Sequence, residues 1–111
     1  MNESPLFTRT HDLLLWLMQV TRKFPREQRF VLARRLQDQA FAFQDALIAA
    51  SLDKRKRLEH LGQADISLTG LRKSLLLCYS MQLLSDGQYR HVSAMVAEVG
   101  RLLGGWRKGI S

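Results

Sequence analysis

The stretch KFPREQRF, residues 23–30, decides the fold, because it places a proline between an apolar segment and a second helix-like segment. A proline fits the first turn of an α-helix, where its missing N–H costs no hydrogen bond. Pro25 therefore predicts a tight turn into a helix. The arginines around it are unexpected, since positive charge at a helix N-terminus is mildly destabilising. Charge arranged against this local preference suggests that it has a function.

Four apolar stripes with spacings of three and four residues extend outward from this turn, and no segment alternates with the period of a strand. Such spacing places each set on one face of a helix. The stripes are Leu13, Leu17, Val20 and Phe24; Ala33, Leu36, Ala40, Phe43, Leu47 and Ala50; Leu61, Ala64, Leu68, Leu71, Leu75 and Cys78; and Tyr89, Val92, Val96, Val99, Leu103 and Trp106.

Local signals give the expected helix boundaries. Asp53 is a candidate cap for the third helix. Ser85 and Gln88 have the spacing of a capping box, which predicts the start of the fourth helix. Gly104 and Gly105 are expected to end that helix or weaken its last turn. The expected helices therefore cover about residues 6–23, 25–51, 54–84 and 88–105.

The connections between these helices are short, which favours antiparallel neighbours. The sequence therefore predicts an all-α protein, a single up-down-up-down four-helix bundle spanning residues 1–111. Nine further apolar residues lie off the main stripes: Leu14, Trp16, Met18, Phe30, Phe41, Leu76, Leu77, Met81 and Leu84. They indicate either self-association or a wide core within one bundle, and both interpretations remain open.

The composition is that of a basic globular protein. Of its 111 residues, 46% are hydrophobic, and 17 Lys and Arg against 10 Asp and Glu give a formal net charge of +7. Such a chain often binds polyanions, although ordinary solubility charge is the alternative. The single cysteine, Cys78, excludes an intramolecular disulfide and fits a cytoplasmic protein. The longest apolar run, residues 13–18, is too short to span a membrane, so a soluble protein is expected.

The positive charge is expected to gather at the two ends of the bundle. Arg22, Lys23, Arg26, Arg29 and Arg90 would share one end, and Arg34 and Arg35 follow them along the second helix. At the other end the candidates are Lys54, Arg55, Lys56, Arg57, Arg107 and Lys108. Asp45 and Asp53 can partly offset that second end, so the first end is the better candidate for binding anions.

Arg26 and Arg29 also continue the line of the second stripe. Either the stripe drifts around the helix and Phe30 replaces them in the core, or the two arginines face a subunit or a ligand.

No residue pattern predicts catalysis. The Glu-x-x-His pairs of a di-iron bundle are absent, and no nucleophile or phosphate-loop motif occurs. His11, His60 and His91 lack metal-ligand spacing, so no metal or cofactor is expected. Cys78 on an apolar stripe is expected to be a buried structural thiol. Aromatic residues do not alternate with basic residues as in platforms that bind single strands, and Trp16 and Trp106 are expected to pack.

The stretches KFPREQRFVLARRLQDQA (residues 23–40) and SDGQYRHVSAMVAEVGRLLGGWRK (residues 85–108) resemble the Avd family. These are the accessory variability determinants of diversity-generating retroelements, within a wider group of bacterial four-helix bundles that includes proteins of ribosomal intervening sequences. The resemblance covers about residues 13–108. Its most specific parts are Phe24-Pro25 with Arg29-Phe30, and Gly100-Arg101 with the run from Leu103 to Trp106.

The resemblance implies a non-enzymatic protein that forms a pentameric barrel. Members of the family bind the retroelement reverse transcriptase and its RNA, and support cDNA synthesis for mutagenic retrohoming. The expected partners are therefore reverse transcriptase, RNA with DNA as a further candidate, and further copies of the chain, but no membrane. A bundle of the intervening-sequence type with another partner is the main alternative. An enzyme or metalloprotein and a membrane-surface helix protein are weaker alternatives, because ligand motifs are absent and the stripes are suited to a core.

Overall fold

The chain is built from four long α-helices, and the computed structural model describes residues 4–110. One turn of α-helix and one π-helical turn lie between the first two long helices. The elements are α1 (Pro5–Thr21), α2 (Arg26–Gln28), η1 (Arg29–Ala33), α3 (Arg34–Leu52), α4 (Arg57–Ser80) and α5 (Asp86–Ile110). No residue from 4 to 110 lies in a strand, so the all-α, four-helix prediction is confirmed. Residues 1–3 and 111 of the predicted domain lie outside the described residues.

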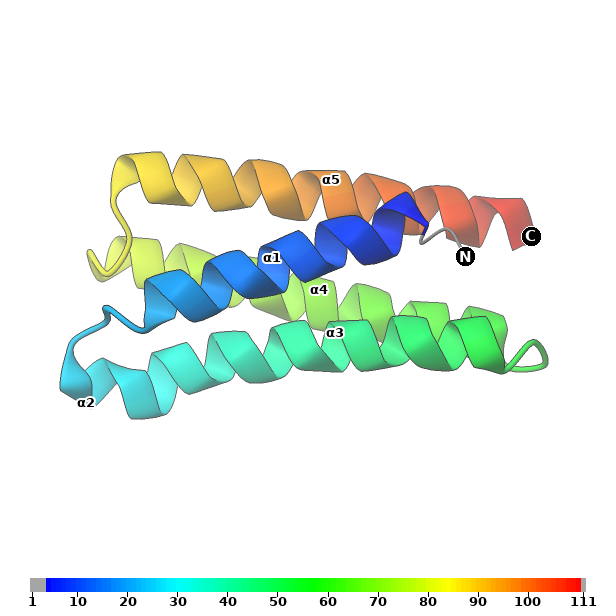
Figure 1. The fold of residues 1–111 in the computed structure, drawn as a ribbon, viewed down its shortest axis with the longest axis horizontal. Helices are drawn as coiled ribbons and strands as arrows, with labels where there is room; N and C mark the ends of the chain where they lie inside the picture. The colour runs from blue at the N-terminus through cyan, green and yellow to red at the C-terminus, as the bar shows by residue number, and fades with distance from the viewer. Residues whose placement is uncertain (1–3, 111) are drawn as a thin grey trace.

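The long helices lie side by side in a body of 43 × 25 × 23 Å, and the connections between them lie at its two ends (Figure 1). One end carries the connections of residues 22–25 and 81–85, and we call it the turn end. The other carries the connection of residues 53–56 together with both chain termini, and we call it the loop end. The main contacts between long helices are those of α1 with α3, α3 with α4, α4 with α5, and α5 with α1.

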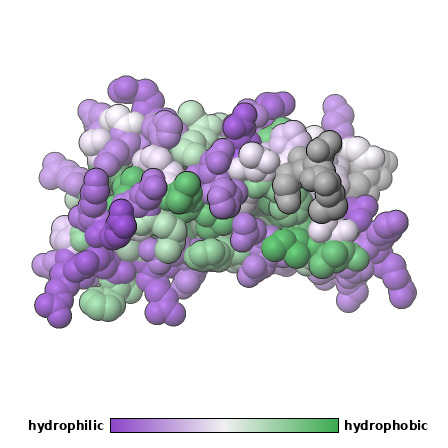
Figure 2. Space-filling view, viewed as in Figure 1, coloured by the Kyte–Doolittle hydropathy of each residue, from purple (hydrophilic) through white to green (hydrophobic). Residues whose placement is uncertain are grey.

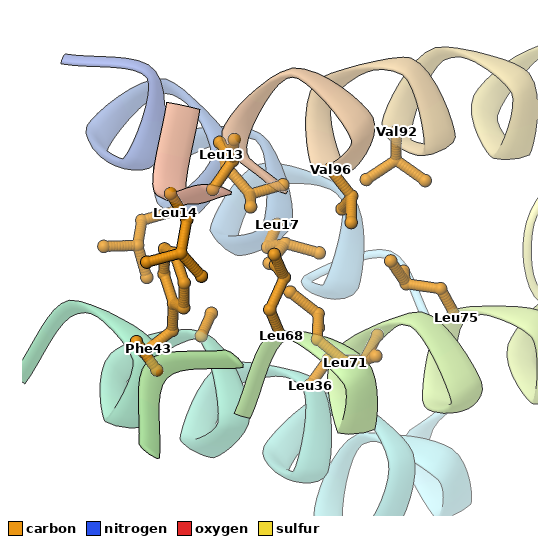
Figure 3. Packing of buried hydrophobic residues seen from close by; sticks show 14 of the residues in the cluster. Leu13, Leu14, Leu17, Leu36, Phe43, Leu68, Leu71, Leu75, Val92 and Val96 are labelled. Carbon is orange, nitrogen blue, oxygen red and sulfur yellow. The ribbon is translucent and has the colours of Figure 1, made fainter. Parts of the chain in front are cut away.

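The predicted apolar stripes form the core. The second and third stripes are buried throughout, whereas Val20, Tyr89 and Trp106 of the other two are only partly buried. Figure 3 shows apolar side chains from all four long helices pointing toward one another, among them Leu17, Leu36, Leu71 and Val96. Each fully buried leucine stabilises the fold by about 1.5–3 kcal/mol. Small residues such as Ala40 and Ala64, both buried, are suited to close approach of two helices.

The predicted capping box at the start of the last helix is confirmed in atomic detail, although α5 begins at Asp86 rather than at residue 88. The Gln88 N–H donates to Ser85 Oγ at 3.1 Å, and the Ser85 N–H donates to Gln88 Oε1 at 2.9 Å. These reciprocal bonds are a capping box. The first helix begins in a related way, with Ser4 Oγ accepting from the Phe7 N–H at 3.4 Å and Pro5 in the first turn.

Four expected boundaries are wrong by one to four residues. Pro25 does not lie inside its helix but immediately before it, and its carbonyl accepts from the Gln28 and Arg29 N–H groups at 2.9 and 3.1 Å. The first helix ends at Thr21 rather than residue 23, since the Phe24 N–H closes a turn onto the Thr21 carbonyl at 3.1 Å. The expected helix 54–84 is shortened to Arg57–Ser80.

Asp53 does not cap α4 directly. Its Oδ1 accepts from the Lys56 N–H at 3.3 Å, which closes the connection before the helix begins at Arg57. The predicted cap is therefore three residues too early.

Gly104 and Gly105 do not end α5, which continues to Ile110. Each glycine in a helix interior is less favourable than alanine by about 1 kcal/mol. The neighbouring Leu103 is buried and Trp106 packs against the core, so tertiary contacts outweigh the local preference.

The C-terminus of α4 contains a strained residue. Gln82 has φ 64°, and the Gln82 and Leu83 N–H groups donate to the carbonyls of Tyr79 and Cys78, both at 2.9 Å. This is the left-handed position of a Schellman-type cap, which normally holds glycine.

We predict that Gln82→Gly raises the free energy of unfolding by about 0.5–1 kcal/mol, because glycine adopts this φ without steric strain. Gln63→Gly, at an exposed position inside α4, is the matched control and should lower it by about 1 kcal/mol. Urea unfolding followed by circular dichroism measures both. Destabilisation by both substitutions would contradict this explanation of the turn.

Candidate nucleic-acid and partner interface

Five cations gather at the turn end of the molecule, as the topology predicted. Arg22 and Lys23 lie in the first connection, Arg26 and Arg29 in the two short helical turns, and Arg90 in the beginning of α5. All five are exposed. Within residues 4–110 none of them forms an ion pair, and neither does their acidic neighbour Glu27. Their charge is therefore available to an external anion.

Arg34 and Arg35 extend this surface along the outside of α3. Arg34 Nε lies 3.6 Å from Asp38 Oδ2, and both side chains are exposed. Such a surface ion pair contributes little to stability. Arg35 is exposed and has no ion pair in the described part of the chain.

At the loop end, the structure uses part of the charge internally. Arg57 donates from Nε to the Ala50 carbonyl at 2.7 Å and from Nη2 to the Ser51 carbonyl at 3.4 Å, and its guanidinium lies 5.9 Å from the Trp106 ring centroid. It therefore caps the C-terminus of α3. Arg107 pairs with Asp65 at 3.1 Å.

Lys54, Arg55 and Lys56 remain exposed at the loop end, and Lys108 of the predicted set is also exposed. The predicted partial neutralisation is only partly right. Asp45 forms no ion pair within residues 4–110. The carboxylate that offsets positive charge there is Asp65, which was not among the predicted residues. Of the two predicted ends, the turn end has the less compensated charge.

The carboxylate of Asp53 is engaged in hydrogen bonds with Lys56 and His60. Its Oδ2 lies 3.2 Å from His60 Nε2. The hydrogen bond from His60, and then the bond from the Lys56 N–H, hold the pKa of Asp53 below its ordinary value of 3.8. His60 therefore has a structural partner on the adjacent connection.

A pair of stacked tyrosines joins α4 to α5 at the turn end. The rings of Tyr79 and Tyr89 are 4.4 Å apart and nearly parallel, and the Tyr79 hydroxyl donates to Asp86 Oδ1 at 2.7 Å. That bond to a carboxylate raises the pKa of Tyr79. This pair was not predicted, because its only signal in the sequence is an aromatic residue on each side of the predicted connection.

The side chains of Cys78 and His91, the remaining candidates for chemistry, are in contact with other parts of the fold. Cys78 is fully buried, and burial raises the pKa of its thiol to about 11, as expected for a structural cysteine. His91 lies against Trp16, with ring centroids 5.8 Å apart. Residues 4–110 contain no group of three His, Cys, Asp or Glu side chains placed to hold a metal ion. No helix in this range is long and apolar enough to cross a membrane.

Several large apolar side chains reach the surface. Leu14 and Leu84 of the nine off-stripe residues are buried and Trp16 is partly buried, whereas the other six are exposed. The exposed large apolar residues are Leu15, Met18, Phe30, Val31, Phe41, Ile48, Leu52, Leu58, Ile66, Leu76, Leu77 and Met81. Figure 2 shows hydrophobic surface on the viewed face, including a patch over α3 toward the loop end. A wide core in one bundle does not account for these residues.

Comparison with protein families decides the classification. The model of the family described as bAvd-like matches residues 6–110. The chain belongs to the bAvd-like family. This confirms the resemblance seen in the sequence, and the family is an accessory, non-catalytic type of protein. A comparison with curated proteins found no match.

We predict that Arg57→Ala lowers the free energy of unfolding by about 1–2 kcal/mol, because it leaves the last carbonyls of α3 without their donor and removes the contact with Trp106. Arg55→Ala removes the same charge from an exposed side chain and should change stability by less than about 0.5 kcal/mol. Urea unfolding at one fixed protein concentration compares them. Equal effects would show that Arg57 does not act as a cap.

Proposed function

We propose that this bAvd-like protein is a non-enzymatic accessory factor of a diversity-generating retroelement. In this role it binds the reverse transcriptase and the template RNA or its cDNA through basic surfaces, and supports mutagenic retrohoming. The observation that carries the proposal is the turn end, where five cations are exposed and form no ion pair with any residue from 4 to 110: Arg22, Lys23, Arg26, Arg29 and Arg90.

Uncompensated cations favour nucleic acid for a physical reason. A protein that neutralises phosphates releases the counterions condensed on the strand, and this release supplies much of the binding free energy. The net charge of +7 also attracts the polyanion from a distance and speeds association. A basic surface of this kind positions the strand through its backbone, without reading its sequence.

The exposed apolar side chains support a second part of the proposal, in which five copies of the antiparallel bundle form a ring. A closed ring of more than two copies requires two different surfaces that are complementary to each other. Met18 and Ile48 are exposed on α1 and α3, which contact each other, and Ile66 and Leu77 are exposed on α4. The monomer thus presents apolar surface on several helices, and contacts between copies would remove it from water.

The binding proposal predicts that exchanging Arg22, Lys23 and Arg26 together for Glu weakens RNA binding by at least about tenfold, since three phosphate partners become repulsive. Lys54, Arg55 and Lys56 exchanged together for Glu form the matched control, with the same change in charge at the loop end, and should bind RNA with a smaller loss. Filter binding at fixed salt measures affinity, and circular dichroism checks that helix content is unchanged.

Unchanged RNA binding by the turn-end variant would contradict the assignment of this surface. Equal losses in both variants would show that only the overall charge matters. Wild-type protein that binds neither RNA nor the reverse transcriptase would favour the intervening-sequence type of bundle instead.

The assembly proposal predicts a solution mass of about 64 kDa, that of five 12.8 kDa chains, by light scattering. Because burial of apolar surface holds the copies together, the mass should be the same at low and high salt. A monomer at both salt concentrations would contradict the ring.

A further inference from the structure

Phe30 is the most exposed aromatic side chain within residues 4–110. It is 77% exposed, on η1, at the turn end. The account in which the stripe drifts and Phe30 enters the core is therefore wrong, and Leu32 and Ala33 are buried instead. The cause is the π-helical turn, in which the Arg34 N–H donates to the Arg29 carbonyl five residues earlier. A wider turn rotates the preceding residues around the axis, so Phe30 faces water.

Arginines surround this ring along the chain. Arg29 is adjacent, and Arg26 and Arg34 lie about one helical turn before and after Phe30. All three are exposed, and among the described residues only Arg34 has an ion pair, with Asp38. No stacking platform was expected from the sequence, which could not include the exposure of Phe30 that the structure adds.

We propose that Phe30 is a stacking platform for an unpaired base of RNA, with the neighbouring phosphates held by Arg26 and Arg29. The inference rests on the proposed function and deepens it by naming the form of RNA that the turn end prefers. An exposed flat ring offers a π-face to any base, and the guanidinium groups offer charge to the backbone on either side. In a duplex the base faces are already stacked, so the ring gains nothing there.

The charge around Phe30 favours RNA over an apolar pocket on a protein. From Arg22 to Arg35 there are six cations and one carboxylate, Glu27. An apolar partner would have to leave these charges without counterions or supply several carboxylates. A single strand supplies a phosphate and a base face with every nucleotide.

The test uses two substitutions that keep an apolar side chain. Phe30→Leu removes the flat ring, and Phe30→Trp enlarges it. Phe41→Leu is the control, since it makes the same change at another exposed phenylalanine, on α3. The probes are an oligouridylate without secondary structure and a fully paired RNA duplex of equal length. Fluorescence anisotropy of end-labelled RNA gives the affinities, and light scattering follows the assembly.

We expect Phe30→Leu to weaken oligouridylate binding about tenfold, within the range known for loss of one base–aromatic stack. Duplex binding should change by less than about twofold. Phe30→Trp should bind the oligouridylate at least as tightly as the wild type. The variant has a third tryptophan beside Trp16 and Trp106. Binding of the strand should therefore quench the tryptophan fluorescence of Phe30→Trp more than that of the wild type. Phe41→Leu should bind like the wild type.

Wild-type affinity of Phe30→Leu, or no added quenching in Phe30→Trp, would overturn the inference and leave the proposed function intact, provided that the turn-end charge reversal still weakens binding. A smaller assembly in Phe30→Leu would show that Phe30 is a subunit contact. Loss of reverse-transcriptase capture with unchanged RNA affinity would show that it is a protein contact. Both results would overturn the inference, and wild-type protein that binds no RNA would overturn it together with the proposed RNA binding.

Discussion

The structure depends on one constraint, the joint burial of four apolar stripes that none of the helices could bury alone. Leu36 and Leu47 of α3 and Leu61, Leu68 and Leu71 of α4 have no exposed surface. Most helical stability in proteins comes from such packing rather than from local propensity. The same constraint fixes where the charge lies, because an ion without a partner cannot enter this core at acceptable cost. The cations are therefore confined to the outer faces and the two ends.

The two ends use their charge differently. At the loop end Arg57 and Arg107 are held by Ala50, Ser51 and Asp65, so part of the positive charge stabilises the fold. At the turn end the cations around Pro25 have no such partners in the part of the chain that the structure describes, and the π-helical turn adds an exposed aromatic ring. The turn end thus combines three features: a short connection, cations at an unfavourable position and a widened helical turn. Irregular helical turns of this kind are frequent at functional sites.

Local and periodic signals predicted much of the fold. The stripes were correct because burial follows the helical period, and the capping box was correct because Ser85 and Gln88 bond to each other. The prediction that Gly104 and Gly105 end the last helix was wrong, because Leu103 and Trp106 hold that turn through tertiary contacts. The capping role of Arg57 and the exposure of Phe30 depend on geometry that local patterns do not encode. For the site, the sequence predicted which cations share an end, but not which of them the fold uses internally.

If the turn end neutralises phosphates, as proposed, the affinity for RNA must depend on the salt concentration through its cations. Each phosphate contact adds about 0.7–0.9 to the slope of log affinity against log salt concentration. Exchanging Arg22, Lys23 and Arg26 together for Gln should lower the magnitude of this slope by about two to three, whereas the same exchange at Lys54, Arg55 and Lys56 should lower it less. Equal slopes for the wild type and the turn-end variant would contradict the account.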